Sequence, residues 1–307
     1  MQIYDLIIIG AGPAGITASV YAARKKLDFL VISLDIGGQA AWSGDIENYT
    51  GYQFISGPEL AAKFEEHMRK YGIALKENEE VLALEKSGEV ISVKTNKGDY
   101  QARSVIIASG KKSRELGVPG EKEFKNRGLT YCATCDGPLF ADREVAVIGG
   151  GNSALDAALQ LIKIAKHVYI INNTGQLTGD EIMRQKVETA SNATVLNNTQ
   201  VVSVTGDKFV SAIKVKDNSG VKELAMQGVF VEIGLIPNVA FAGKLERDEG
   251  GEIKIDSANQ TNIPGIFAAG DVTDVQEKQI IIAAGEGSKA ALSVFRYLAR
   301  KNFKKGE

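Results

Sequence analysis

Short apolar runs alternate with glycine clusters along this chain, and each run has the length of one buried strand. The first run, Leu6 to Ile9, ends in the turn Gly10 to Gly15 and is followed by a helical stretch to about Lys25 and a second run, Phe29 to Ile32. Continuous apolar runs bounded by glycine are typical of parallel strands that are covered on both faces. The pattern therefore predicts a strand, a helix and a strand that form one βαβ unit.

The same arrangement returns about 140 residues later in the chain. An apolar run from Val145 to Ile148 leads into the turn Gly149 to Ala154, a helix to about Lys163 and a strand from Val168 to Ile171. Two copies of one unit are far rarer by chance than a single copy. The repeat predicts an α/β protein with two Rossmann-like three-layer dinucleotide-binding domains.

Each glycine of the first turn has its own physical task. Gly10 permits the tight turn, Gly12 lets the backbone approach a pyrophosphate, and Gly15 lets helix and strand pack closely. The helix that follows offers unpaired N–H groups and a positive dipole end to phosphate oxygens. In the second turn Gly149 and Gly151 keep their places and Ala154 replaces the third glycine, which this fingerprint allows.

The rest of the chain completes the two units. Residues 81–100 and 201–233 alternate between apolar and polar positions around short turns, which predicts two small antiparallel meanders. Residues 105–108 predict a buried strand, and residues 265–271 predict a short strand that ends in an acid. A last helix is expected from near Gln279 to Arg300.

Composition narrows the class of protein. The chain has 307 residues, a length that favours two domains, and 44% hydrophobic and 24% charged residues, as in soluble globular proteins. A net charge of −2 without a long basic run gives no footprint for nucleic acid. No apolar stretch approaches the roughly 18 residues of a membrane span. We therefore expect a cytoplasmic protein that binds neither nucleic acid nor membrane.

The chain has two cysteines, Cys132 and Cys135. A pair at this spacing excludes a disulfide framework and indicates redox chemistry or half of a metal site. Zinc needs about four ligands, and His67 and His167 are isolated in the sequence, so we expect no metal. The plainer interpretation is two thiols without a role, with Asp136 as a helix N-cap. The position of the pair just before the second nucleotide fold favours redox use.

The order of the motifs resembles the low-molecular-weight thioredoxin reductases, a branch of the FAD-dependent disulfide reductases with two dinucleotide-binding domains. The match covers essentially the whole chain, and its most specific element is Cys132-Ala133-Thr134-Cys135-Asp136 just before the second glycine turn. The other matching motifs are Gly10 to Gly15, Gly37-Gly38-Gln39, Glu47-Asn48-Tyr49, Gly149 to Ala154, Ile233-Gly234 with Pro237-Asn238, Phe267 to Asp271, and Gln279.

The resemblance implies a particular domain organisation. Residues 1–112 and 245–307 would form a discontinuous FAD-binding domain, and residues 113–244 an inserted second dinucleotide-binding domain that carries the cysteine pair. It also implies a homodimer and a rotation between the domains during turnover. The rotation answers a physical need, because the flavin must meet its electron donor and the disulfide in turn.

The resemblance assigns unequal catalytic roles to the redox motif. Cys135 would face the flavin, and Cys132 would attack the disulfide of thioredoxin through a mixed disulfide that Cys135 resolves. Asp136 would act as general acid and base for the thiols.

The expected FAD contacts are spread over the chain. The residue that should grip a ribose hydroxyl after the first βαβ unit is either Ser33 or Asp35, and the sequence does not decide between them. The full expected set is Gly10, Gly12, Pro13, Ala14, Gly15, Ser33, Asp35, Gly37, Gly38, Gln39, Asn48, Gly270, Asp271 and Gln279.

The second nucleotide fold departs from the family pattern. NADPH-using members carry a His-Arg-Arg run and a further Arg that clamp the 2′-phosphate, whereas Ile171 to Gly179 holds no cation here. Losing contacts of about 1.5–3 kcal/mol each should weaken NADPH strongly. Asn172 could still bind a ribose hydroxyl, which leaves NADH open, and the turn at Gly149, Gly151 and Ala154 is either a weak nucleotide site or an inherited scaffold.

Three functions follow from this departure. A further branch of the family takes electrons from reduced ferredoxin, and the missing cations favour ferredoxin as the donor here, with NADH second. One alternative is an NADH-dependent reductase that serves thioredoxin or a peroxidase partner. Another is a flavin-binding redox sensor without turnover, against which Asp136 and Gln279 argue, because a sensor needs no proton carrier.

Overall fold

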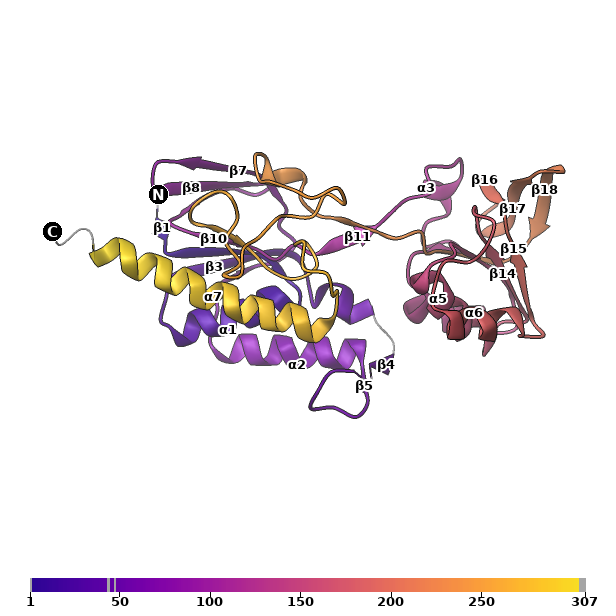
Figure 1. Ribbon diagram of the computed structural model, residues 1–307, viewed down its shortest axis with the longest axis horizontal. Helices are drawn as coiled ribbons and strands as arrows, with labels where there is room; N and C mark the ends of the chain where they lie inside the picture. The colour runs from indigo at the N-terminus through magenta and orange to yellow at the C-terminus, as the bar shows by residue number, and fades with distance from the viewer. Residues whose placement is uncertain (1, 43–44, 47, 304–307) are drawn as a thin grey trace. The chain divides into compact units, whose positions relative to one another are not determined.

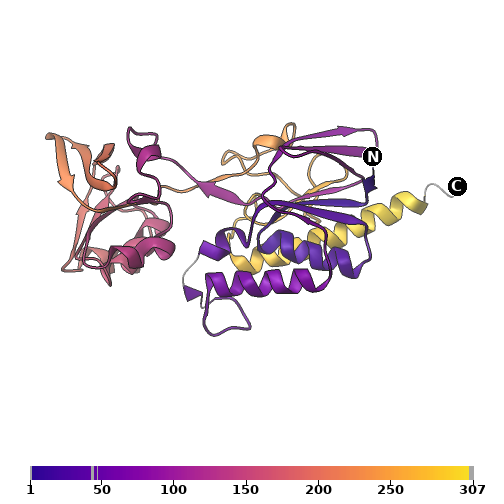
Figure 2. The same ribbon diagram turned by 180° about the vertical axis from the view of Figure 1, so that it is seen from behind.

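The computed structural model describes residues 2–42, 45, 46 and 48–303 (Figures 1 and 2). The chain forms two compact units, one from residues 1–112 and 236–307 and the other from Ser113–Leu235. The chain passes between the units at β11 (Lys111–Ser113) and β20 (Leu235–Pro237), and these two strands pair with each other. The second unit is thus inserted into the first.

The return to the first unit comes earlier than residue 244, where the sequence had placed it. Asn238 explains the difference. Its backbone N–H donates to the carbonyl of Gly110 at 3.0 Å, its Nδ2 donates to the carbonyl of Ser109 at 2.9 Å, and the Ser109 hydroxyl donates to its carbonyl at 2.7 Å. Val239 and Ala242 then enter the hydrophobic core of the first unit. Residues 236–244 therefore belong with the first unit.

The first unit is built on a five-stranded parallel sheet in the order β21-β10-β2-β3-β6. The strands are β21 (Ile266–Ala268), β10 (Val105–Ile107), β2 (Leu6–Ala11), β3 (Phe29–Ile36) and β6 (Leu75–Lys76). Helices α1 (Pro13–Arg24), α2 (Gly57–Lys70) and α7 (Ile280–Phe303) lie on one side of it. The other face is covered by the sheet β1 (Ile3–Tyr4), β9 (Asp99–Ala102), β8 (Val90–Thr95) and β7 (Val81–Ser87).

Strand β2 shows why this unit has three layers. Its side chains alternate between the faces of the sheet, so Leu6 and Ile8 join the core beneath the helices while Ile7 and Ile9 join the core beneath the meander. All four are at most 4% exposed. A strand that is buried on both faces must be apolar throughout, which is the continuous run seen in the sequence.

The second unit repeats this plan with the parallel order β12-β19-β13-β14-β15. Its strands are β12 (Leu129–Thr130), β19 (Gly228–Val231), β13 (Glu144–Ile148), β14 (His167–Ile171) and β15 (Ala193–Leu196). Helices α5 (Asn152–Ile162) and α6 (Glu181–Glu188) pack in one core, and the meander β16 (Gln200–Gly206), β17 (Val210–Asp217) and β18 (Gly220–Ala225) packs in the other. The predicted fold class, two Rossmann-like three-layer domains with one inserted in the other, is confirmed.

Short elements complete the two units. They are β4 (Asp45–Ile46), β5 (Ile55–Ser56), α3 (Glu121–Phe124), α4 (Ala133–Asp136) and the 3-10 turns Gly38–Trp42, Gly137–Phe140 and Ala240–Ala242.

Helices α2 and α6 were missing from the sequence prediction. The start of α2 nevertheless has a signal, because the Ser56 hydroxyl accepts from the backbone N–H of Glu59 at 3.4 Å, the spacing of a capping box. At α6 the Asp180 carboxylate accepts from the N–H of Ile182 at 2.9 Å. Both caps were readable from the residue types alone.

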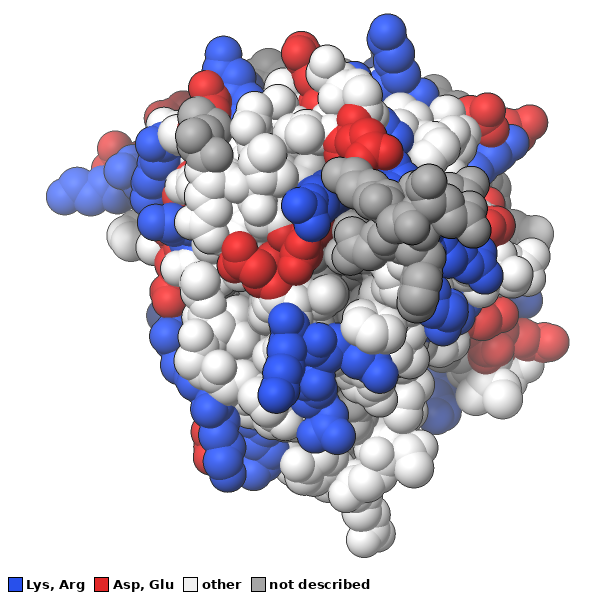
Figure 3. Space-filling model, turned by 90° about the vertical axis from the view of Figure 1, so that its left-hand side faces the viewer, with Lys and Arg blue, Asp and Glu red and all other residues white. Residues whose placement is uncertain are grey.

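Charges of both signs are mixed on the part of the surface shown in Figure 3, where Lys and Arg side chains lie beside Asp and Glu. A surface ion pair joins Lys301 Nζ, near the end of α7, to Glu89 Oε1 at 3.2 Å. Among the residues that the structure describes, no helix combines the length and the apolar character needed to cross a membrane.

Candidate functional site

The first glycine turn lies between β2 and α1. Gly10 has a φ of +104°, and a Cβ atom there would lie 2.3 Å from the carbonyl oxygen of Ala108. A Cβ on Gly15 would lie 1.9 Å from the carbonyl oxygen of Gly10. Real Cβ atoms do not approach so closely, so both positions need glycine: the first for its backbone conformation, the second for the close helix-strand contact.

The start of α1 is shaped to receive an anion. Gly12 is the N-cap residue in an extended conformation, with no side-chain cap and no acidic residue in the first turn. A Cβ on Gly12 would meet only the Cα of Gly38, at 4.0 Å. The first N–H groups of α1 therefore lack a side-chain acceptor, and the backbone around Gly12 is open, which fits a pyrophosphate.

The two candidates for the ribose contact lie differently. The hydroxyl of Ser33 is buried, donates to the carbonyl of Asp35 at 2.6 Å and accepts from the N–H of Ala11 at 2.9 Å. Ser33 thus joins the end of β2 to the end of β3. Asp35 is exposed near the end of β3, and its carboxylate faces solvent.

Four residues expected to contact the flavin make contacts within the first unit. Asn48 Nδ2 donates to Gln279 Oε1 at 3.0 Å across 231 residues of chain. Gln39 Nε2 donates to the carbonyl of Lys111 at 2.8 Å. Gly38, just before Gln39, has a φ of +54° and its Cα faces Gly12. Gly38 thus lies beside the first glycine turn.

Asp271 follows β21, close to the same turn. A Cβ on Gly270 would lie 3.0 Å from the Cβ of Ala14, so the backbone before Asp271 passes directly over the start of α1. Burial raises the pKa of the Asp271 carboxyl above its ordinary value, while Lys278 and Lys111 act in the opposite direction. Asp271 therefore stands beside the place expected for FAD.

The two lysines near Asp271 were not found from the sequence. Glu252 bridges them, with one carboxylate oxygen 2.5 Å from Lys111 Nζ and the other 3.0 Å from Lys278 Nζ. All three side chains are at most 24% exposed. They come from three separate segments, and no motif in the sequence joins them.

The cysteine motif lies in the second unit. Cys132 is disulfide-bonded, and its backbone N–H donates to the Thr130 hydroxyl at 3.2 Å. The next four residues form α4, in which the N–H of Asp136 donates to the Cys132 carbonyl at 3.2 Å. The side chain of Cys135 lies outside the described residues.

Asp136 is half-buried and stands where a helix cap could be, just before the 3-10 turn Gly137–Phe140. Its side chain makes no capping hydrogen bond there. The plainer interpretation of Asp136 as an N-cap thus finds no support at this turn.

The second glycine turn copies the backbone of the first. Gly149 has a φ of +136°, and a Cβ there would lie 2.2 Å from the carbonyl oxygen of Glu232. The N-cap Gly151 is extended and again has no side-chain cap. Ala154 is fully buried, so the position of the third glycine tolerates a methyl group here.

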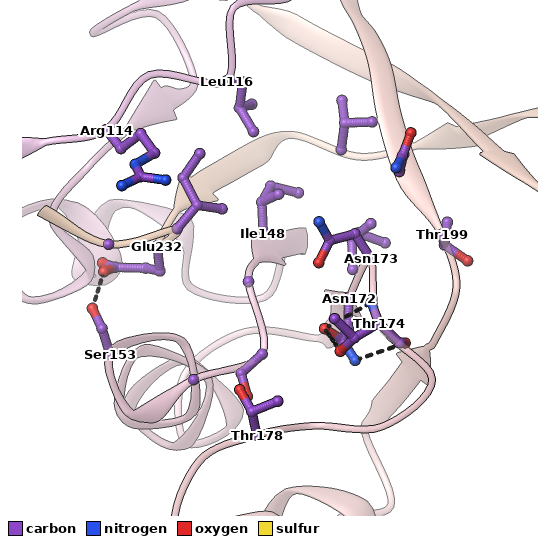
Figure 4. Close-up of a pocket in the computed structure, with 18 of the residues that line it drawn as sticks. Arg114, Leu116, Ile148, Ser153, Asn172, Asn173, Thr174, Thr178, Thr199 and Glu232 are labelled. Atoms are coloured by element: carbon purple, nitrogen blue, oxygen red, sulfur yellow. Dashed lines mark hydrogen bonds between the residues drawn. The ribbon is translucent and has the colours of Figure 1, made fainter. Parts of the chain in front are cut away.

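A pocket of about 650 Å³ opens over this turn (Figure 4). Its size falls within the range of small-molecule sites. The residues that line it come from the turn, the segment after β11, the end of β14 and the loop after it, the start of β16 and the segment after β19: Arg114, Leu116, Ile148, Gly149, Gly150, Gly151, Asn152, Ser153, Ile171, Asn172, Asn173, Thr174, Thr178, Thr199, Gln200, Val201, Glu232, Ile233 and Gly234.

Asn172, expected to face a ribose, is 2% exposed and tied to the protein. Its Nδ2 donates to the carbonyl of Thr174 at 3.1 Å and to Asn197 Oδ1 at 2.8 Å, and its Oδ1 accepts from the Thr174 hydroxyl at 3.0 Å. A Cβ on Gly150 would lie 2.4 Å from that Oδ1. Asn172 therefore packs beneath the turn, and the exposed Asn173 beside it lines the pocket.

Two charged residues, Arg114 and Glu232, line this pocket, and neither was found from the sequence. Burial, first of all, and Asp156 raise the pKa of Glu232 to about 7, against the opposing effect of hydrogen bonds from Ser153 and the Ala133 N–H. Glu232 lies just past the carboxyl end of a parallel strand, where ligands bind in such sheets, so this signal was available. Arg114 had no comparable signal.

A turn fitted to a dinucleotide in each unit, with a disulfide motif in the second, defines the class of two-domain disulfide oxidoreductases. Residues 4–287 match the family model described as "Pyridine nucleotide-disulphide oxidoreductase", and the chain belongs to this family. Members of the thioredoxin reductase type bind FAD, and the residues at the first glycine turn fit that cofactor. Gly10, Gly12, Gly15 and Asp271 are the residues that would hold it.

Solved structures place the chain among the low-molecular-weight thioredoxin reductases, as the motifs had indicated. The chain is 37% identical to the Lactococcus lactis thioredoxin reductase (FR conformation), with a TM-score of 0.87 over 97% of this chain and 99% of that one. It is 33% identical to a ferredoxin-flavin thioredoxin reductase from Clostridium acetobutylicum, with a TM-score of 0.54 over 97% and 98%.

Curated relatives carry other names. The chain is 42% identical to the "NADH dehydrogenase" of Ferdinandcohnia aciditolerans and 40% identical to an alkyl hydroperoxide reductase component of Xanthomonas campestris pv. phaseoli. Each match covers 97% of this chain and 58% of the relative. The chain thus spans less than two thirds of the length of these relatives.

Proposed function

We propose that the chain is an FAD-dependent disulfide reductase that takes electrons from NADH and passes them through the Cys132–Cys135 pair to a protein disulfide of the thioredoxin type. The observation that carries this proposal is the pocket over the second glycine turn, which lies in the same unit as the cysteine motif. A redox pair and a dinucleotide pocket in one unit suit a chain that links a nicotinamide donor to a disulfide.

The residues of the chain divide the reaction between them. FAD, when bound at the first glycine turn, supplies the transfer of an electron pair from the donor to the disulfide. Two electrons and two protons convert the Cys132–Cys135 disulfide into two thiols. The Cys132 thiolate then attacks the substrate disulfide, Cys135 displaces the substrate thiol from the mixed disulfide, and Asp136 takes and returns the proton.

The pocket suits NADH better than NADPH. Asn173, Thr174 and Thr199 are uncharged and line one side of it, while Arg114 lies on the opposite side (Figure 4). A 2′-phosphate on the side of Asn173 would find no cation among the lining residues. Charge-assisted contacts to phosphate contribute about 1.5–3 kcal/mol each, so their lack disfavours NADPH.

Ferredoxin, which the sequence alone favoured as the donor, is the second candidate. The observation in its favour is that the side-chain amide of Asn172 donates its hydrogen bonds to Thr174 and Asn197. One expected contact to a ribose is therefore lost. The likeness to the ferredoxin-flavin enzyme agrees with it. We place NADH first because the pocket is formed, and a donor that docks on the surface does not require it.

The acceptor has two candidates. The likeness to thioredoxin reductases supports thioredoxin, and the likeness to the alkyl hydroperoxide reductase component supports a peroxidase partner. A sensor without turnover is less suited to an Asp136 that is not used as a cap. The homodimer and the domain rotation implied by the family stay part of the proposal.

Anaerobic stopped-flow reduction of the bound FAD tests the donor. NADH, NADPH and reduced ferredoxin are mixed in parallel with the FAD-loaded protein, and the loss of flavin absorbance is followed. We expect rapid reduction by NADH at micromolar concentration and much slower reduction by NADPH. Rapid reduction by ferredoxin with no response to NADH would contradict the donor assignment and favour the second candidate.

A further inference from the structure

Glu232 occupies a position in the second unit that the proposed mechanism does not use. It follows β19, and its backbone N–H donates to the Ile148 carbonyl at 2.8 Å. That bond places it beside the first residues of the second glycine turn. Its side chain lines the dinucleotide pocket (Figure 4).

The carboxyl of Glu232 contacts two functional turns at once. The hydroxyl of Ser153, the second residue of α5, donates to its Oε2 at 2.5 Å. The backbone N–H of Ala133, the residue directly after Cys132, also donates to this carboxyl. One titratable group thus joins the turn that should bind the dinucleotide to the turn that carries the redox pair.

The charges around Glu232 set its response to a ligand. Arg114 is the other charged residue of the pocket lining, and Figure 4 places it on the same side as Glu232. Helix α5 contributes Asp156, which disfavours a second negative charge nearby, and α4, which begins at Ala133, also carries the titratable Asp136. Burial, first of all, raises the pKa of Glu232 to about 7, so near neutral pH its charge can change at little cost.

A dinucleotide brings two negative charges on its pyrophosphate into this pocket. An ionised Glu232 would repel them, and the repulsion is stronger in a partly buried site than in water. Taking up a proton removes the repulsion. By linkage, a ligand that binds the protonated form more tightly must itself promote protonation.

We propose that Glu232 couples the dinucleotide pocket to the redox pair, a positioning role that rests on the proposed function. It takes up a proton as the anionic dinucleotide binds, and in doing so loosens its hold on the Ala133 N–H beside Cys132. A neutral carboxyl is a weaker acceptor than a carboxylate, so the hydrogen bond from Ala133 weakens. The loss of a negative charge also favours the thiolate of Cys132 once the disulfide is reduced.

The first part of the proposal is that Glu232 takes up a proton when the dinucleotide binds. It is tested by the affinity of the FAD-loaded protein for NADH, measured by NADH fluorescence from pH 6 to 8.5. The wild-type affinity should fall about five- to tenfold as the pH rises, because the dinucleotide must then compete with an ionised Glu232. Calorimetry in buffers of different ionisation enthalpy should detect proton uptake on binding. Glu232→Gln keeps an acceptor oxygen for Ala133 and should abolish both effects.

Two neighbouring substitutions should move the midpoint of that profile in opposite directions. Ser153→Ala removes a hydrogen bond that stabilises the ionised carboxyl, so the midpoint should rise. Asp156→Asn removes a negative neighbour, so the midpoint should fall. Glu223→Gln makes the same chemical change at an exposed position on β18 and should leave the profile as in the wild type. A purely structural role for Glu232 would not produce these opposite shifts.

The second part of the proposal is that the charge of Glu232 affects the thiolate of Cys132. It is tested by the rate at which iodoacetamide alkylates Cys132. In a reduced Cys135→Ser background, Glu232→Gln should speed alkylation at pH 7 severalfold, while Glu223→Gln should not. Equal rates in both would overturn the link to the redox turn. NADH binding that does not change with pH would overturn the coupling and leave the donor assignment intact. Failure of NADH to bind the wild type would overturn both.

Discussion

The two glycine turns of this chain have nearly the same backbone but different surroundings. The N-cap residues Gly12 and Gly151 have φ values of −80° and −91° and ψ values of −174° and −175°. At the third fingerprint position, however, a methyl group would collide with the backbone at Gly15, while Ala154 carries one in a buried site. The shared fingerprint therefore specifies the backbone of the turn. The distance between helix and strand differs between the two units.

The carboxyl group near each turn differs in a similar way. Asp271 in the first unit and Glu232 in the second both have a pKa raised by burial. Lys278 and Lys111 counteract the effect at Asp271, whereas Asp156 adds to it at Glu232. Glu252 adds to the rise at Asp271, and hydrogen bonds from Ser153 and the Ala133 N–H oppose it at Glu232. The two carboxyls thus share the effect of burial and differ in what counteracts it: cations in the first unit, hydrogen-bond donors in the second.

Removing the nucleophile Cys132 should have the largest effect, because it stops the disulfide chemistry of the second unit and leaves flavin reduction in the first unit intact. Cys132→Ser should lower the reduction of thioredoxin by roughly 1,000-fold or more, since no other group can attack the substrate disulfide. Electron transfer from NADH to ferricyanide should continue, because it does not need the pair. Both rates are measured by NADH absorbance. A variant that still reduces thioredoxin at the wild-type rate would contradict the mechanism.

Exchanging the third fingerprint residues tests the difference in packing. Gly15→Ala should destabilise the protein by about 1–3 kcal/mol and lower its FAD content, because the new Cβ would lie against the Gly10 carbonyl. Ala154→Gly should cost about 1–2 kcal/mol, from helix propensity and the loss of one buried methyl group. Urea unfolding and flavin absorbance measure both. Gly285→Ala in α7, where a Cβ meets nothing within 4 Å, is the matched control and should be neutral or stabilising.

Adding a cation to the pocket over the second glycine turn tests whether its lining disfavours NADPH. Asn173→Arg should raise kcat/KM for NADPH about ten- to a hundredfold, because one charge-assisted contact to a phosphate contributes about 1.5–3 kcal/mol. The values for NADH should change little. Gln176→Arg adds the same charge to an exposed position of the same loop outside the lining and should not favour NADPH. Equal gains in the two variants would mean that general charge, not the pocket, is responsible.

Neutralising Asp271, the carboxyl near the first glycine turn, should have the smallest effect of these substitutions. Asp271→Asn should weaken FAD binding about tenfold through one lost charge-assisted contact. The FAD-free variant should be more stable than the wild type at pH 7: the folded-state pKa of Asp271 is raised, so its ionisation costs stability as the pH rises through that range. The stability difference should shrink towards pH 4. Urea unfolding at both pH values measures it, and a gap that widens at low pH would reverse the sign of the argument.

Much of the fold was readable from the residues because its signals are local. An apolar run such as Leu6 to Ile9 reports a strand buried on both faces, and glycine at positions 10 and 149 reports backbone that other residues cannot adopt. Helices α2 and α6 also had local caps, which were overlooked. The end of the second unit could not be placed in this way, because it depends on Asn238 bonding to Ser109 across 129 residues.

The candidate site was predicted less evenly. The first turn and the cysteine motif were found because each is a contiguous run with a chemical task. Glu232 was missed because its partners, Ser153 and Ala133, are 79 and 99 positions away in the chain. Asn172 was expected to face a ligand because of its place after a strand. Its amide instead satisfies the backbone and side chains beneath Gly150, as a buried polar group must.

The sequence by itself determined where this chain turns, which strands are buried and which cysteines can form a redox pair. Glycine, proline and apolar residues act on their own backbone and immediate neighbours, so their structural effects can be predicted from the sequence alone. The tertiary structure decided which polar groups meet: Asn48 with Gln279, Glu252 with its two lysines, and Glu232 between the two functional turns. Hydrogen bonds and charges act over a few ångströms in space, and distance along the chain carries no information about that separation.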